Sequence, residues 1–157
     1  MTPMYVLFLF LHVAAALWLA GGVFASAVVR VQGKRAATLA ERGLAAQLLW
    51  RLHVVYTLPG LLVGGFVGFY LVTAGGFRFN EVWVMASSFL YLLMFLSTLF
   101  LVTPALQRQR LAAEQAAVST EAVTHLELAL ANKLPGVLSD VNALIILVLV
   151  FLMVIKP

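Results

Sequence analysis

Four long apolar stretches alternate with shorter polar segments along the chain. They cover residues 4–29, 52–77, 82–106 and 137–155, and crossing a hydrocarbon layer about 30 Å thick takes roughly 20 helical residues. Because lipid offers no hydrogen bonds to the backbone, each stretch is predicted to be a membrane-spanning α-helix. The first stretch lacks the basic start of a cleavable signal peptide, so we interpret it as a span.

The polar segments predict how these helices are connected. The second connection is tight, with Gly75–Gly76 ending one helix and Asn80 as the expected N-cap of the next. Residues 30–51 form a polar hinge followed by an amphipathic stretch at 39–50, and residues 107–134 are also amphipathic. Helices are therefore expected to protrude there as a cytoplasmic hairpin. The expected fold is all-α: a single domain, residues 1–157, forming an up-and-down four-helix bundle in the membrane, with kinks at Pro104 and Pro135.

Composition supports a membrane protein. The chain is 64% hydrophobic and only 10% charged, whereas soluble domains are roughly 45–50% apolar and about 25% charged. Soluble enzymes and nucleic-acid-binding modules are therefore excluded. The absence of cysteine excludes disulfides, iron–sulfur clusters and covalent c-type haem.

The basic residues predict the orientation. Two of the ten, Arg78 and Lys156, lie on the side of the termini, and the other eight flank the first and third connections: Arg30, Lys34, Arg35, Arg42, Arg51, Arg108, Arg110 and Lys133. By the positive-inside rule, both termini are expected in the periplasm of a bacterial inner membrane.

His12 is the first candidate for chemistry, because an ionisable side chain within a span is costly and is commonly functional. Ala15 and Ala16 leave a shallow groove near its helix face, into which a flat ring or another helix could press. His12 is therefore either an axial ligand of haem b or a neutral imidazole hydrogen-bonded to a serine or tyrosine of a neighbouring helix.

Glycines in the second span form a small-xxx-small pattern at Gly60, Gly64 and Gly68. This spacing predicts close helix packing, or a surface on which a macrocycle approaches the backbone opposite His12. His53 is an alternative iron ligand, but helix rise places it at another depth, so the two histidines are not expected to share one iron.

Polar side chains in the last two spans predict hydrogen bonds between helices. Ser87, Tyr91 and Thr98 share one face of the third span, and Asn142 lies near the start of the fourth. Asp140 lies near the cytoplasmic boundary, where we expect it to pair with Arg51.

Several segments together resemble a known family. Leu11–Val13, Tyr56–Pro59 with Gly68, and the terminal residues 151–157 resemble the bacterial predicted integral membrane proteins of domain of unknown function 2269. Through His12 and Gly22 the chain is more loosely similar to HemJ-type protoporphyrinogen oxidases and CopD-like copper-resistance proteins. The resemblance implies a four-helix, haem-associated scaffold.

Three functions are compatible with these patterns. The first is a haem b-binding or redox-associated membrane protein, with His12 as ligand and the glycines accommodating the macrocycle. The second is a non-catalytic accessory subunit of a larger membrane complex, whose glycine face and cytoplasmic hairpin pack against partner subunits or further copies of itself. The third is transport of copper or of a small solute.

The charge distribution makes a testable prediction about topology. A cysteine introduced as Lys34→Cys is expected to resist a membrane-impermeant thiol reagent in intact cells, whereas Arg78→Cys is expected to react. The opposite labelling pattern would show that the termini are cytoplasmic.

Overall fold

Helices form all the regular structure of residues 3–119 and 122–156, the part of the chain that the computed structural model describes. The elements in chain order are α1 (Pro3–Arg35), α2 (Leu39–Leu52), the π-helical turn η1 (His53–Thr57), α3 (Leu58–Ala74), α4 (Val82–Ser97), the π-helical turn η2 (Thr98–Val102), α5 (Thr103–Ala116), α6 (Val123–Ala131) and α7 (Leu134–Ile155).

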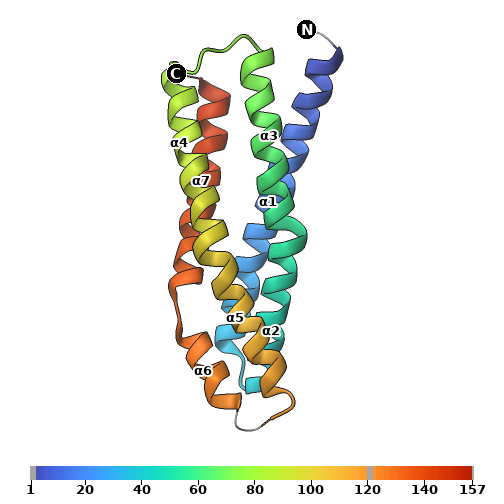
Figure 1. Ribbon diagram of the computed structural model, residues 1–157, viewed down its shortest axis with the longest axis vertical. Coiled ribbons are helices and arrows are strands. Elements are labelled where there is room, and N and C mark those ends of the chain that lie inside the picture. Colours follow the sequence, from blue (N-terminus) through green and yellow to red (C-terminus); the bar gives the residue numbers. More distant parts are fainter. Residues whose placement is uncertain (1–2, 120–121, 157) are drawn as a thin grey trace.

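These elements make four rods in the described chain, each long and apolar enough to cross a membrane. One rod is α1, and the others are α2–η1–α3, α4–η2–α5 and α6–α7. They run antiparallel, with both termini at one end of the bundle and α2, α5 and α6 at the other (Figure 1). We call these the terminal end and the polar end. The predicted all-α four-helix bundle is thus confirmed.

Prolines cause the two π-helical turns. Pro59 and Pro104 each follow a π-helical turn closely, and each lacks the N–H that would continue the α-helical hydrogen bonds. The backbone instead closes wider turns, in which Leu58 N–H donates to His53 O and Thr103 N–H donates to Thr98 O. The kink predicted near Pro104 therefore has a counterpart before Pro59.

The terminal half is held together by close contact between α1 and α3. A Cβ atom added to Gly60 would lie 2.7 Å from the backbone nitrogen of Leu19, so the two backbones meet there. Beyond this contact, the largest apolar cluster joins the rods: Leu19, Val23, Leu61, Met94, Ile145, Ile146 and Leu149. Glycine is needed at position 60 because any side chain would separate α1 from α3.

The polar end has a small apolar core of its own. Ala46 of α2, Ala112 and Ala113 of α5, and Leu126 of α6 are all buried against one another. α2 begins with a capping box in which Thr38 Oγ1 accepts from Glu41 N–H and the Glu41 carboxylate accepts from Thr38 N–H. The protruding helices predicted from the sequence are therefore packed together at this end.

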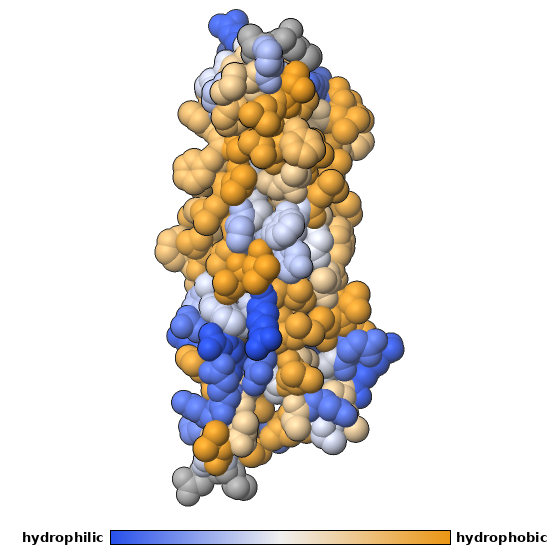
Figure 2. Space-filling view, turned by 90° about the vertical axis from the view of Figure 1, so that its right-hand side faces the viewer, coloured by the Kyte–Doolittle hydropathy of each residue, from blue (hydrophilic) through white to orange (hydrophobic). Residues whose placement is uncertain are grey.

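The molecular surface divides along the long axis. Hydrophobic side chains dominate the terminal half, and hydrophilic side chains gather towards the polar end (Figure 2). Large apolar residues such as Phe66, Phe89 and Val154 are strongly exposed. Exposed apolar side chains around an apolar interior are those of a lipid-facing bundle.

The predicted N-cap of the third rod was wrong. Glu81, rather than Asn80, is the N-cap residue of α4. The Glu81 carboxylate accepts hydrogen bonds from Arg78 N–H at 2.9 Å and from Trp83 Nε1 at 2.8 Å, which close the tight connection. The Glu81 carboxylate accepts both hydrogen bonds, one on each oxygen, and the amide oxygen of Asn80 accepts neither.

Two glycines on one face of α3 make a matched test of this packing. Gly60→Ala is expected to lower the melting temperature clearly, because overpacking against a backbone costs about 1–3 kcal/mol. Gly64→Ala is expected to be tolerated, since its Cβ would lie 3.9 Å from Ala15 Cβ, an ordinary contact. Thermal unfolding of the purified protein measures both, and equal melting temperatures would contradict the close approach at Gly60.

Candidate functional site

A cavity of about 420 Å³ lies inside the bundle, between the apolar cluster of the terminal half and the polar end. All four rods contribute to it. Its walls include apolar side chains such as Leu49, Val102 and Leu106, which also pack against one another. Polar and charged side chains line the rest: Ser26, Arg30, Lys34, Arg42, His53, Thr57, Thr98, Gln109, Asn132, Lys133, Ser139, Asp140 and Asn142.

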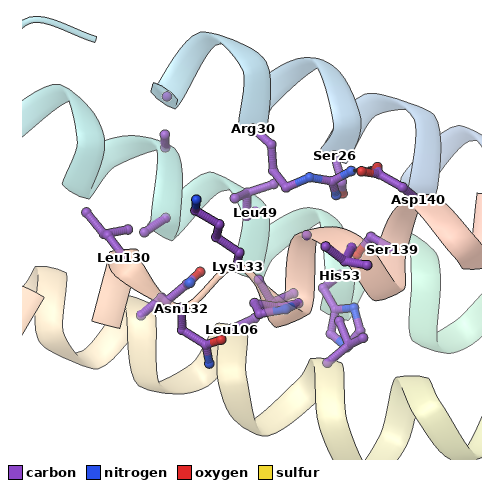
Figure 3. A pocket seen from close by; sticks show the side chains of 18 of the residues that line it. Ser26, Arg30, Leu49, His53, Leu106, Leu130, Asn132, Lys133, Ser139 and Asp140 are labelled. Atoms are coloured by element: carbon purple, nitrogen blue, oxygen red, sulfur yellow. Dashed lines mark hydrogen bonds and ion pairs between the residues drawn. The ribbon is translucent and has the colours of Figure 1, made fainter. Parts of the chain in front are cut away.

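The fourth rod is interrupted beside the cavity. α6 ends at Ala131 and α7 begins at Leu134, whose N–H donates to Asn132 Oδ1 at 3.0 Å. Pro135 follows directly and removes a further backbone donor. The interruption brings Lys133 to the cavity wall from the connecting segment, across from Arg30 of α1 (Figure 3).

A chain of hydrogen bonds links three rods along one wall. His53 Nε2 lies 2.8 Å from Thr103 Oγ1, and Thr103 Oγ1 donates to Thr98 O at 2.8 Å. Asn142 Nδ2 donates to Thr98 Oγ1 at 3.0 Å, and Ser97 Oγ lies 3.3 Å from Asn142 Oδ1. The interhelical bonding predicted for Thr98 and Asn142 is thereby confirmed, as is that of Tyr91, whose hydroxyl donates to Leu61 O. The prediction was wrong for Ser87, whose buried hydroxyl has no hydrogen-bond partner in the described part of the chain.

This chain fixes the proton on His53. The single hydroxyl proton of Thr103 is donated to Thr98 O, so Thr103 Oγ1 acts as the acceptor from His53. The Nε2 of His53 therefore carries a proton, and in the neutral ring the lone pair is on Nδ1. His53 is only 3% exposed, and its role in the fold is to join the second rod to the third.

The expected pairing of Asp140 with Arg51 was wrong. Asp140 Oδ1 instead accepts from Arg30 Nη2, across the interface between α1 and α7 (Figure 3). Arg51 is exposed. The Arg30 side chain lies over Gly136, where an added Cβ would be 3.6 Å from Arg30 Cδ. The approach of α1 to the start of α7, which sequence spacing does not reveal, decides the partner.

His12 lies in a different place, at the contact of α1 with α3. Its Nδ1 is 3.1 Å from Gly64 O, and its ring lies over Gly68, where an added Cβ would be 3.0 Å from His12 Cε1. Because a carbonyl only accepts, Nδ1 is the donor. The His12 ring is therefore hydrogen-bonded to the backbone of a neighbouring helix, and not to the serine or tyrosine that was expected.

Haem b does not fit the glycine face. Leu19 covers Gly60, Ala15 lies over Gly64 and the His12 ring lies over Gly68, so α1 fills the surface on which a macrocycle was expected. A porphyrin between α1 and α3 would require these rods to separate. His53 does not share a site with His12, because its ring is bonded to Thr103. Among residues 3–119 and 122–156, no group of three or more His, Asp or Glu could hold a metal ion.

Trp18 has a structural role in this part of the bundle. Its Nε1 donates to Val55 O at 2.9 Å, and its ring stacks on Tyr56 at 5.0 Å between centroids. Val55 is four residues before Pro59, so its carbonyl is the one that proline leaves without an α-helical donor. Trp18 supplies that donor in a region where lipid offers none.

Sequence reasoning missed several residues of the cavity: Ser26, Arg30, Thr103, Asn132 and Lys133 contribute to it or to its hydrogen bonds. Arg30 and Lys133 were interpreted only as topology signals. The sequence does contain one indication of the cavity: a proline follows His53 and Thr98 at the same distance, six residues later in each case. That shared spacing marks the two π-helical turns that line the cavity.

Four apolar rods of membrane-spanning length around a polar cavity define a multi-pass helical membrane protein. The chain belongs to the family of predicted integral membrane proteins of domain of unknown function 2269, whose family model matches residues 6–157. No curated protein and no solved structure matches the chain significantly. The looser likeness to HemJ-type and CopD-like proteins stays a prediction.

The position of His12 predicts a packing role that can be separated from iron binding. His12→Ala is expected to lower the melting temperature, because it removes the bond to Gly64 O and the ring over Gly68. It is expected to leave the visible absorption spectrum of the purified protein unchanged. His125→Ala, at an exposed position on α6, is the matched control. A Soret band that is present in the wild type and lost only in His12→Ala would contradict this assignment.

Proposed function

We propose that this membrane protein binds a small molecule in the cavity at its polar end. The cavity itself is the observation that carries this proposal. Its volume of about 420 Å³ falls within the roughly 300–1,000 Å³ range of small-molecule sites. Apolar walls with a few convergent polar groups are also typical of such sites.

The polar side chains around the cavity support binding from the polar end. Leu19, Leu61, Met94 and Ile145 belong to the apolar cluster, and each lies on the terminal side of the nearest cavity residue of its rod. Leu61 is 0% exposed and Met94 is 2% exposed, so this cluster closes the cavity towards the terminal end. With the orientation predicted from the basic residues, the cavity is reached from the cytoplasm of a bacterial cell.

The haem hypothesis depended on a glycine face open to a macrocycle. α1 covers that face at Gly60, Gly64 and Gly68, so the face does not support a haem site. The accessory-subunit hypothesis also rests on the cytoplasmic hairpin, so it stays a prediction. Copper transport is also not favoured, because none of the described residues that line the cavity is a methionine, and soft thioether ligands are those that select copper(I). Binding of a small solute is the function that the geometry supports best.

Filling the cavity tests this proposal. Ser139→Trp places an indole at the cavity wall on α7, whereas Ser88→Trp places one at an exposed position on α4. Saturation-transfer NMR of the protein in nanodiscs is used with butyrate, butyramide and butylamine, which share a chain length but differ in charge. At least one probe is expected to bind the wild type and Ser88→Trp, and to lose its signal with Ser139→Trp.

Two outcomes would overturn the proposal. The first is that none of the three probes binds the wild type and that no small molecule is extracted with the purified protein. The second is equal binding of a probe to both tryptophan variants, which would place it outside the cavity.

A further inference from the structure

We infer that the ligand of the cavity is a small organic anion, and that its carboxylate or phosphate replaces Asp140 on the guanidinium of Arg30. This inference rests on the proposed function and adds the class of ligand. In the structure, the Asp140 carboxylate of the protein itself occupies the position on Arg30 that the ligand's anionic group would take.

More basic than acidic side chains line the cavity. Among the residues that the structure describes, one acidic residue, Asp140, lines it together with four basic residues: Arg30, Lys34, Arg42 and Lys133. Within the described residues, neither Lys34 nor Lys133 forms an ion pair with a carboxylate. Positive charge in a partly enclosed space attracts anions, and the low surrounding dielectric strengthens that attraction.

The two partners of the ion pair differ in exposure. The Arg30 side chain is 13% exposed, whereas the Asp140 side chain is 67% exposed. Asp140 is already largely hydrated, so its hydration changes little when it moves away from Arg30. Arg30, by contrast, would be left as a buried charge without a partner, which is strongly unfavourable. An incoming anion that binds Arg30 avoids this cost, so exchange of one carboxylate for another is the favourable way to fill the cavity.

Arginine suits this exchange because its planar guanidinium binds carboxylates and phosphates with paired hydrogen bonds. The side chain is also held in place. Its stem packs over Gly136, which leaves room for it between α1 and α7. Lys133 lines the same cavity from the segment before α7 (Figure 3), so it is placed to supply a second positive charge to the bound anion.

The remaining walls favour an organic ligand over a bare inorganic ion. Leu49, Val102 and Leu106 give apolar surface beside the charged groups. Burial of a short hydrocarbon tail against them would contribute to affinity, at roughly 25 cal/mol per Å² of apolar area. Butyrate and butyl phosphate are therefore the probes of choice, since each combines an anionic group with a short tail.

The test compares dissociation constants for butyrate and butyl phosphate in nanodiscs of zwitterionic lipid. Arg30→Gln is expected to weaken binding at least about tenfold, because hydrogen bonds to charged groups contribute about 1.5–3 kcal/mol. Lys133→Gln is expected to weaken it by a smaller factor. Arg108→Gln, at an exposed position on α5, is the control and is expected to leave binding unchanged.

Asp140→Asn is the decisive variant, because it removes the competing carboxylate and is expected to tighten binding of both anions. A variant that only damages the fold would not bind more tightly, so this gain separates exchange on Arg30 from a structural effect. Weaker or unchanged binding to Asp140→Asn would overturn the inference.

A comparison of butyrate with butyramide and butylamine distinguishes failure of this inference from failure of the proposed function. If butyramide or butylamine binds as tightly as butyrate, and Ser139→Trp still abolishes binding, the cavity is a binding site but not one for anions. A competition experiment with lipid identifies the source of the anion. Competition by phosphatidylglycerol added to the nanodiscs would assign the site to a lipid headgroup, and absence of competition would assign it to a soluble anion; both results support the anionic class.

Discussion

Satisfying backbone hydrogen bonds without water is the constraint on which this structure depends. A proline within a membrane helix leaves a carbonyl without its usual donor. Before Pro59, that carbonyl belongs to Val55, and the indole of Trp18 donates to it from α1. The π-helical turns η1 and η2 are the local response of the backbone. Both contribute residues to the cavity wall, so the accommodation of two prolines shapes the candidate site.

The two halves of the bundle are packed differently. In the terminal half, backbone contact at Gly60 and a continuous apolar cluster hold the rods close together. In the polar half, the break between α6 and α7 separates the rods, and long polar side chains line the space between them. Buried polar groups are costly unless they are paired. The chain from His53 through Thr103 and Thr98 to Asn142 meets that requirement while leaving the cavity open.

This division explains why the histidines have structural roles in the fold. Each ring links α-helical rods through a single hydrogen bond, His12 to the backbone of α3 and His53 to the hydroxyl of Thr103. The charged groups, by contrast, meet in one place, where α1 passes the start of α7. Chemistry in this bundle is therefore expected where positive charge faces the cavity. The imidazole of His53 supports the wall of that cavity, and the imidazole of His12 joins α1 to α3 away from it.

The sequence by itself determined the class of protein and much of its architecture. Apolar stretches of sufficient length require spanning helices in lipid, short connections require antiparallel neighbours, and glycines at four-residue intervals indicate close packing. Only the tertiary structure decided which side chains contact one another. The carbonyl of Gly64 accepts from His12, and Asp140 meets Arg30 and not Arg51. The rotation of each helix about its axis and the break before α7 set these contacts, and both result from the packing of all four rods together, which no single segment encodes.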